Sequence, residues 1–161
     1  MFPLLLLIQE HAAEVAEAPK GGLLSPSGGL MIDKGAKIKV IDVEGWYDAG
    51  KIETMLETNQ TMLEKGRARK PASSDGNTIV DPVYIEDNVT LKGSTIGPNV
   101  SIGTGSVIEN SKVSHSIVGT NSRIARSTIS NSLVGDDTVL DGVTGEVTVG
   151  DHSEVRVSPA S

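Results

Sequence analysis

Residues 96–107 read IGPNVSIGTGSV, and this stretch decides the fold. It places an aliphatic residue followed by glycine at Ile96 and again, six residues later, at Ile102. Similar units follow further along the chain: VGTNSR at 118–123, VGDDTV at 134–139 and VGDHSE at 149–154. Such a unit describes a short strand with one inward side chain, followed by a corner where Gly or Asn allows the backbone a positive φ.

The repeat extends through the C-terminal half of the chain. Aliphatic residues recur about six apart at Ile79, Ile85, Leu91, Ile96, Ile102 and Ile108. The spacing then becomes sixteen in the sets Gly103/Gly119/Gly135, Ile108/Ile124/Leu140, Ser111/Ser127, Val113/Ile129 and Ser116/Ser132, and Val149-Gly150 comes one residue early. Three six-residue units close a coil of about eighteen residues, so we expect four to five stacked coils of parallel strands. Because sixteen falls short of eighteen, an irregular corner is expected near 114–116 and 130–132.

Composition agrees with a narrow interior and restricts the choice of partners. The 161 residues include one Trp, two Tyr and one Phe, so aliphatic side chains must fill the core. A net charge of −7 argues against nucleic acid as a partner. The apolar run at 2–8 is too short to span a membrane, and the lack of cysteine is compatible with a cytoplasmic protein.

The repeat units resemble the hexapeptide-repeat family, whose pattern is an aliphatic residue, Gly, two variable residues and a small residue. The resemblance implies a mainly β fold, a left-handed parallel β-helix, over residues 79–158. Left-handedness comes only from this resemblance, because parallel crossovers are otherwise almost always right-handed.

A different kind of sequence precedes the repeats. A strand is expected from Lys37 to Val43, and apolar residues at helical spacing predict a helix that begins around Lys51 and stops at Gly66. PASSDGN at 71–77 has the composition of a linker. We therefore divide the chain into a segment of unclear fold (1–28), a short α/β remnant (29–70), a linker (71–78) and the β-helix (79–158).

The strand, the loop Trp46-Tyr47-Asp48-Ala49-Gly50 and the helix together resemble the end of the catalytic domain of sugar-1-phosphate nucleotidyltransferases, especially long glucose-1-phosphate thymidylyltransferase-like members. Those enzymes continue into a left-handed β-helix. The resemblance implies that Asp48 is a Mg²⁺ ligand, that Trp46 packs the substrate-binding loop and that Gly50 allows its turn. An alternative role for Asp48 is to favour the N-terminus of the helix through its charge.

The chain lacks the Gly-rich nucleotide loop, the upstream metal-binding Asp and the sugar-phosphate Lys of that family. We therefore expect the chain to be a truncated, fused or misframed C-terminal portion that is inactive alone and needs no cofactor. The resemblance implies that the full-length enzyme uses Mg²⁺ and that its substrates are dTTP and glucose 1-phosphate. The resemblance also implies a homo-oligomer, with a trimer favoured, assembled through the β-helix.

Two other functions stay open. The chain is alternatively a non-catalytic β-helix scaffold, since stacked β-helices have open ends that call for partners. A second and less favoured alternative is a hexapeptide-repeat acyltransferase, which would need a catalytic His such as His115. A three-His zinc site is not expected, because the repeats contain only His115 and His152.

Overall fold

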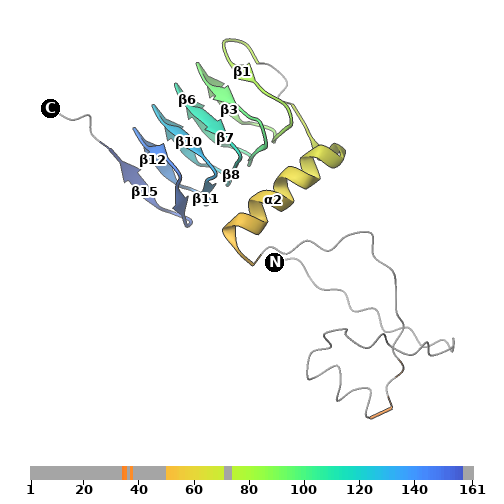
Figure 1. Ribbon diagram of the computed structural model, residues 1–161. Helices are drawn as coiled ribbons and strands as arrows, with labels where there is room; N and C mark the ends of the chain where they lie inside the picture. The colour runs from red at the N-terminus through yellow and green to blue at the C-terminus, as the bar shows by residue number, and fades with distance from the viewer. Residues whose placement is uncertain (1–33, 36, 38–49, 71–73, 158–161) are drawn as a thin grey trace. The chain divides into compact units, whose positions relative to one another are not determined.

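The computed structural model describes residues 34, 35, 37, 50–70 and 74–157 (Figure 1). Every helix and strand that the structure describes lies within residues 47–161. The expected strand from Lys37 to Val43 lies, apart from Lys37, outside the described residues.

The repeats form a β-solenoid of five coils, as expected (Figure 1). Three parallel sheets run along it, and each coil contributes one strand to each sheet. Sheet A contains β2 (Val83–Ile85), β5 (Val100–Ile102), β8 (Ser116–Val118), β11 (Leu133–Val134) and β14 (Thr148–Val149). Sheet B contains β1 (Thr78–Ile79), β4 (Thr95–Ile96), β7 (Lys112–Ser114), β10 (Thr128–Ser130) and β13 (Thr144–Gly145). Sheet C contains β3 (Thr90–Lys92), β6 (Val107–Glu109), β9 (Arg123–Ala125), β12 (Val139–Asp141) and β15 (Glu154–Arg156).

The strand register confirms the sixteen-residue period and shows that the coils shorten along the chain. Thr78 pairs with Thr95, seventeen residues on. Ile108 pairs with Ile124 and Ile124 with Leu140, sixteen residues apart each time. In the last coil Val134 pairs with Val149, so the early Val149-Gly150 reflects a coil one residue shorter.

Stacked aliphatic side chains fill the solenoid, and the core of buried residues contains no aromatic side chain. The fully buried members are Ile85, Ile96, Ile102, Ile108, Ile124, Ile129 and Leu140, with four valines, Val83, Val100, Val113 and Val134. Their similar size explains why one layer stacks on the next without a gap. The aromatic-poor composition follows from this narrow prism.

Each kind of corner turns on a residue with a left-handed φ. Between sheets B and A these residues are Asn99, His115 and Asn131, with φ of 59°, 46° and 47°. In the third coil this corner is one residue, His115, between β7 and β8, and in the fourth it is Asn131 and Ser132. The irregular corners expected near 114–116 and 130–132 are therefore confirmed. Asn and His are both among the residues that adopt this conformation more often than most residues other than Gly.

Buried serines tie successive coils together at the corners. The Ser127 amide donates to Ser111 Oγ at 3.0 Å, and the Val143 amide donates to Ser127 Oγ at 3.1 Å. A second ladder lies at the corner between sheets B and A, where the Ser132 amide donates to Ser116 Oγ at 3.1 Å. The repeated serines thus supply acceptors for amides that would otherwise be buried without a partner.

Replacing Ser127 by alanine is expected to destabilise the fold by about 1–3 kcal/mol, because the buried Val143 amide loses its acceptor. Urea unfolding followed by circular dichroism measures the change. Ser130→Ala is the matched control, since Ser130 lies at the partly exposed end of β10, and an equal loss in both variants would contradict the ladder's role.

A helix precedes the solenoid and packs against sheet A. Helix α2 (Ile52–Met62) begins after Lys51, whose amide donates to Thr54 Oγ1 at 3.2 Å. A short π-type segment, η1 (Leu63–Arg67), follows, and within it Gly66 has a φ of 88°. The predicted start around Lys51 and the stop at Gly66 are both confirmed. After the stop, Arg69 pairs with Tyr84 of β2 and continues sheet A by one residue.

Candidate functional site

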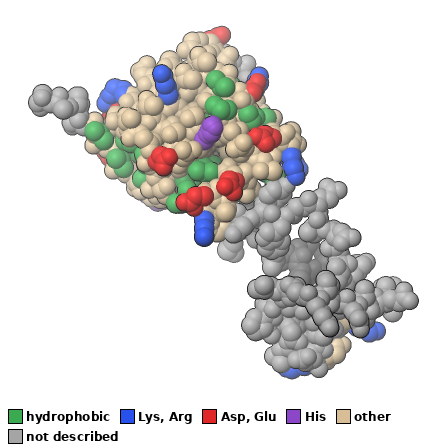
Figure 2. Space-filling model, viewed as in Figure 1, with side chains coloured by type: hydrophobic (Ala, Val, Ile, Leu, Met, Phe, Trp, Pro, Cys, Tyr) green, Lys and Arg blue, Asp and Glu red, His purple; other side chains and the backbone are tan. Residues whose placement is uncertain are grey.

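A groove of about 450 Å³ separates α2 from the corner between sheets B and A. We call it the α2 groove. It is lined by Ile52, Glu53, Leu56, Glu57 and Gln60 of α2 and by Asn99, His115, Asn131, Glu146 and Thr148 of the solenoid. Acidic side chains lie on this face of the molecule, with a histidine among them (Figure 2).

The solenoid wall of the groove is a row of corner residues, one from each of three successive coils. Asn99, His115 and Asn131 all have a left-handed φ, and all three line the groove at the same edge of the solenoid although their corners differ in length. Coils stack at the interstrand distance of about 4.8 Å, which sets the spacing of the row. Asn131 Nδ2 donates to Glu146 Oε1 at 2.9 Å and joins the row to the last coil.

The helical wall comes from the spacing of α2. Glu53, Glu57 and Gln60 follow one another at four and three residues, so they share one face of the helix. Ile52 and Leu56 have the same four-residue spacing and add apolar surface. The helical wall therefore presents two carboxylates, one amide and two aliphatic side chains to the groove.

Polar contacts hold α2 on the solenoid beneath the groove. Asn59 Nδ2 donates to the Asn99 carbonyl at 3.3 Å, and Ser101 Oγ donates to Asn59 Oδ1. Sheet A faces the helix through the outward side chains of its central strands, among them the partly buried Ile117 and Leu133. Leu63, at the end of α2, is 4% exposed. These contacts fix the position of the helical carboxylates relative to the corner row.

The residues that sequence reasoning placed in a site lie elsewhere or outside the described part. Trp46 and Asp48 lie outside the described residues, so the metal role of Asp48 and the packing role of Trp46 stay predictions. Gly50 is an exposed bend directly before Lys51 and α2. His115 lines the α2 groove, whereas His152 lies at a corner of the last coil.

The α2 groove itself was not predicted from the sequence. The signal available was the row of corner residues at sixteen-residue spacing, Ser114-His115-Ser116 and Ser130-Asn131-Ser132. That spacing predicts that His115 and Asn131 stack, but nothing in it indicates that α2 lies beside them.

Comparison with known proteins gives the same family as the sequence resemblance. The chain is 33% identical over 107 residues to a glucose-1-phosphate thymidylyltransferase of Streptomyces antibioticus. This alignment covers 55% of the chain. The chain is thus similar to part of a thymidylyltransferase. A second enzyme of that name, from Streptomyces griseus, is 29% identical over 110 residues, which cover 66% of the chain.

The chain spans about a third of the length of these thymidylyltransferases, 30% of the first and 31% of the second. No family model matches it. The similarity therefore falls on a part of these enzymes, and the described part of the chain is a β-solenoid with one helix before it. Within the described part of the chain, no helix is long and apolar enough to cross a bilayer.

Sheet C carries a charged surface. Glu109 accepts from Lys92 Nζ at 3.0 Å and pairs with Arg123, and Asp141 pairs with Arg126 and Arg156. The Lys92 hydrogen bond and the Arg123 charge hold the pKa of Glu109 below its ordinary value. The stacked coils thus place opposite charges beside one another on sheet C.

This lowered pKa predicts an acid-dependent contribution to stability. A carboxyl whose folded pKa lies below its unfolded value, about 4.3 for Glu, stabilises the fold above that value, and the contribution is lost as pH falls through the folded pKa. Glu109→Gln should therefore lower the urea midpoint at pH 7 and have less effect at pH 3. An equal effect of Glu109→Gln at both pH values would show that the carboxylate charge is not involved.

Proposed function

We propose that the chain is the β-helical portion of a glucose-1-phosphate thymidylyltransferase-like enzyme, that it assembles copies of itself and that it does not catalyse nucleotide transfer alone. The supporting observation is that homology to two thymidylyltransferases falls on a chain whose described residues form a solenoid and one helix. The reaction of the parent enzyme would join dTTP and glucose 1-phosphate, release pyrophosphate and use Mg²⁺ on the phosphates.

Assembly is proposed through the solenoid, with a homotrimer as the expected form. In the described part of the chain, β13, β14 and β15 are edge strands that pair on one side only. A Cβ atom built on Gly150, at a corner of the last coil, would meet no described atom within 4 Å. Edge strands leave backbone groups that need a partner or solvent. We also propose the cytoplasm as the location, with neither a membrane nor a nucleic acid as partner.

A pyrophosphate-release assay tests the catalytic half of the proposal. The purified chain is incubated with dTTP, glucose 1-phosphate and Mg²⁺, and a complete thymidylyltransferase is run in parallel as positive control. We expect release at the level of the protein-free blank while circular dichroism shows folded β structure. Release above the blank that is abolished by Asp48→Asn would overturn the proposed inactivity and assign the metal role to Asp48.

A further inference from the structure

The α2 groove is acidic and bare of positive side chains. Glu53, Glu57 and Glu146 line it, and none of its lining residues is Lys or Arg. In the described part of the chain no ion pair holds Glu53 or Glu57, unlike Glu109 and Asp141 on sheet C. Three carboxylates within one groove raise the local concentration of cations. The charge of the groove thus selects for a positively charged ligand.

One residue that lines the groove, Asn99, carries a buried acceptor without a donor. Asn99 lines the groove and is only 8% exposed, and its Oδ1 has no hydrogen-bond partner. Its backbone is fully used, since the Asn99 amide donates to the Pro82 carbonyl and its carbonyl accepts from the Ser116 amide. A buried polar atom without a partner is rare and indicates a missing water, ion or ligand. Because Oδ1 only accepts, the missing group must be a donor.

Aliphatic surface alternates with these acceptors. Ile52 and Leu56 line the groove beside the helical glutamates, each one residue before a glutamate, and Ile52 is 36% exposed. The groove follows α2 past the corner row of three coils, Asn99, His115 and Asn131, so it is elongated along the solenoid axis. A ligand that matches it is linear, with methylene groups between hydrogen-bond donors.

We propose that the α2 groove binds a linear aliphatic amine with two or more ammonium groups. Each ammonium carries three N–H donors and one positive charge, which suits the carboxylates of Glu53, Glu57 and Glu146. The methylene chain lies against Ile52 and Leu56, and one donor serves Asn99. A metal ion fits less well, because no group of three metal-ligating side chains gathers among the described residues.

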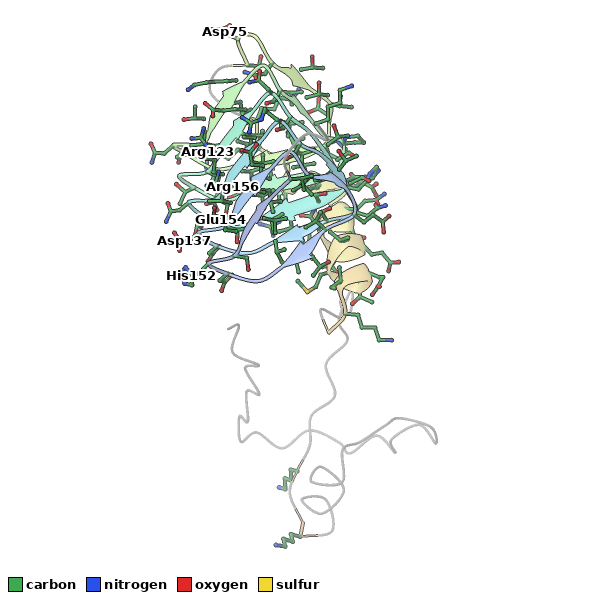
Figure 3. All side chains as sticks on the ribbon, turned by 90° about the vertical axis from the view of Figure 1, so that its left-hand side faces the viewer. Asp75, Arg123, Asp137, His152, Glu154 and Arg156 are labelled. Carbon is green, nitrogen blue, oxygen red and sulfur yellow. The ribbon has the colours of Figure 1, made fainter. Side chains whose placement is uncertain are left out.

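The two histidines of the solenoid allow binding to be tested by NMR with an internal control. His115 lines the groove, whereas His152 lies across the solenoid from α2, beside Asp137 (Figure 3). Titrating spermidine into the full chain at about 20 mM salt should shift the imidazole resonances of His115 and leave those of His152 unchanged. Salt screens exposed charges, so about 200 mM NaCl should weaken the binding.

A charge-matched pair of variants locates the ligand. Calorimetry with Glu53→Gln/Glu57→Gln should give a Kd about tenfold weaker, because two carboxylates that face the ammonium groups lose their charge. Asp137→Asn/Glu154→Gln removes the same charge from the opposite side and should leave the Kd unchanged. Asn99→Gly removes the acceptor while tolerating the left-handed φ, and should also weaken binding.

Several results would overturn the proposal. These are no heat or shift with spermidine at millimolar concentration, equal weakening by both double variants, or shifts at His152 as large as at His115. Binding of Mg²⁺ or of a lysine-rich peptide at His115 without binding of spermidine would assign the groove to a metal ion or to a protein partner instead.

Discussion

Gly135→Ala is expected to destabilise the solenoid by about 3 kcal/mol or more. A Cβ on Gly135 would lie 2.5 Å from the Asp151 amide nitrogen and 2.5 Å from the Gly150 carbonyl carbon. Both are backbone atoms of the next coil, so relief requires the two coils to move apart. Gly135 does not have a left-handed φ, and the effect is therefore purely one of space. Urea unfolding followed by circular dichroism measures the loss.

Gly150 provides the matched control for this prediction. It occupies the same corner one coil later, and a Cβ built there meets nothing within 4 Å. Gly150→Ala should change stability by no more than about 0.5 kcal/mol. A loss at Gly150 equal to that at Gly135 would contradict the close stacking of coils as the reason for the repeated glycine.

Ile124→Ala is expected to cost about 3 kcal/mol. Ile124 is 0% exposed and stacks between Ile108 and Leu140 in sheet C. Truncation leaves a cavity inside the prism, and the coils above and below cannot close it while their strands stay paired. The same unfolding experiment measures the cost.

Val139 is the matched control, because it tests whether the cost of truncating Ile124 comes from its inward-pointing side chain. It lies next to Leu140 in β12 but points outward and is partly exposed. Val139→Ala should cost below about 1 kcal/mol. Comparable losses for Ile124→Ala and Val139→Ala would show that the inward register is wrong.

The fold was largely predictable because one residue period governs both the core and the corners. The sets Ile108/Ile124/Leu140 and Val113/Ile129 are stacked strand partners in the structure. The shortfall from eighteen residues predicted the irregular corners, which are confirmed at His115 and Asn131. Residues one period apart become stacked partners because every coil repeats the same environment.

The sequence pattern could not predict contacts between the repeats and elements outside the repeat, such as α2. Asn59 binds Ser101 and the Asn99 carbonyl across some forty residues of chain, and neither spacing nor composition marks this pair. The α2 groove depends on that docking. The serine sets at sixteen-residue spacing were visible, yet their role as acceptors for amides of the next coil required the structure.

The stretch between Trp46 and Gly66 contains both the loop that carries the family resemblance and the helix that precedes the solenoid. Its resemblance to a nucleotidyltransferase loop agrees with the thymidylyltransferase homology. Its second half forms α2 and η1, as the apolar spacing predicted. In our proposal this stretch joins a catalytic portion to an assembling β-solenoid, and α2 also forms one wall of the polyamine groove.

The molar mass of the purified chain in solution tests the assembling role most directly. Light scattering coupled to size exclusion, at micromolar concentration and with circular dichroism confirming β structure, should give about three times the chain mass of 16.8 kDa. A single folded species of 16.8 kDa would contradict the proposal that this solenoid assembles copies of itself.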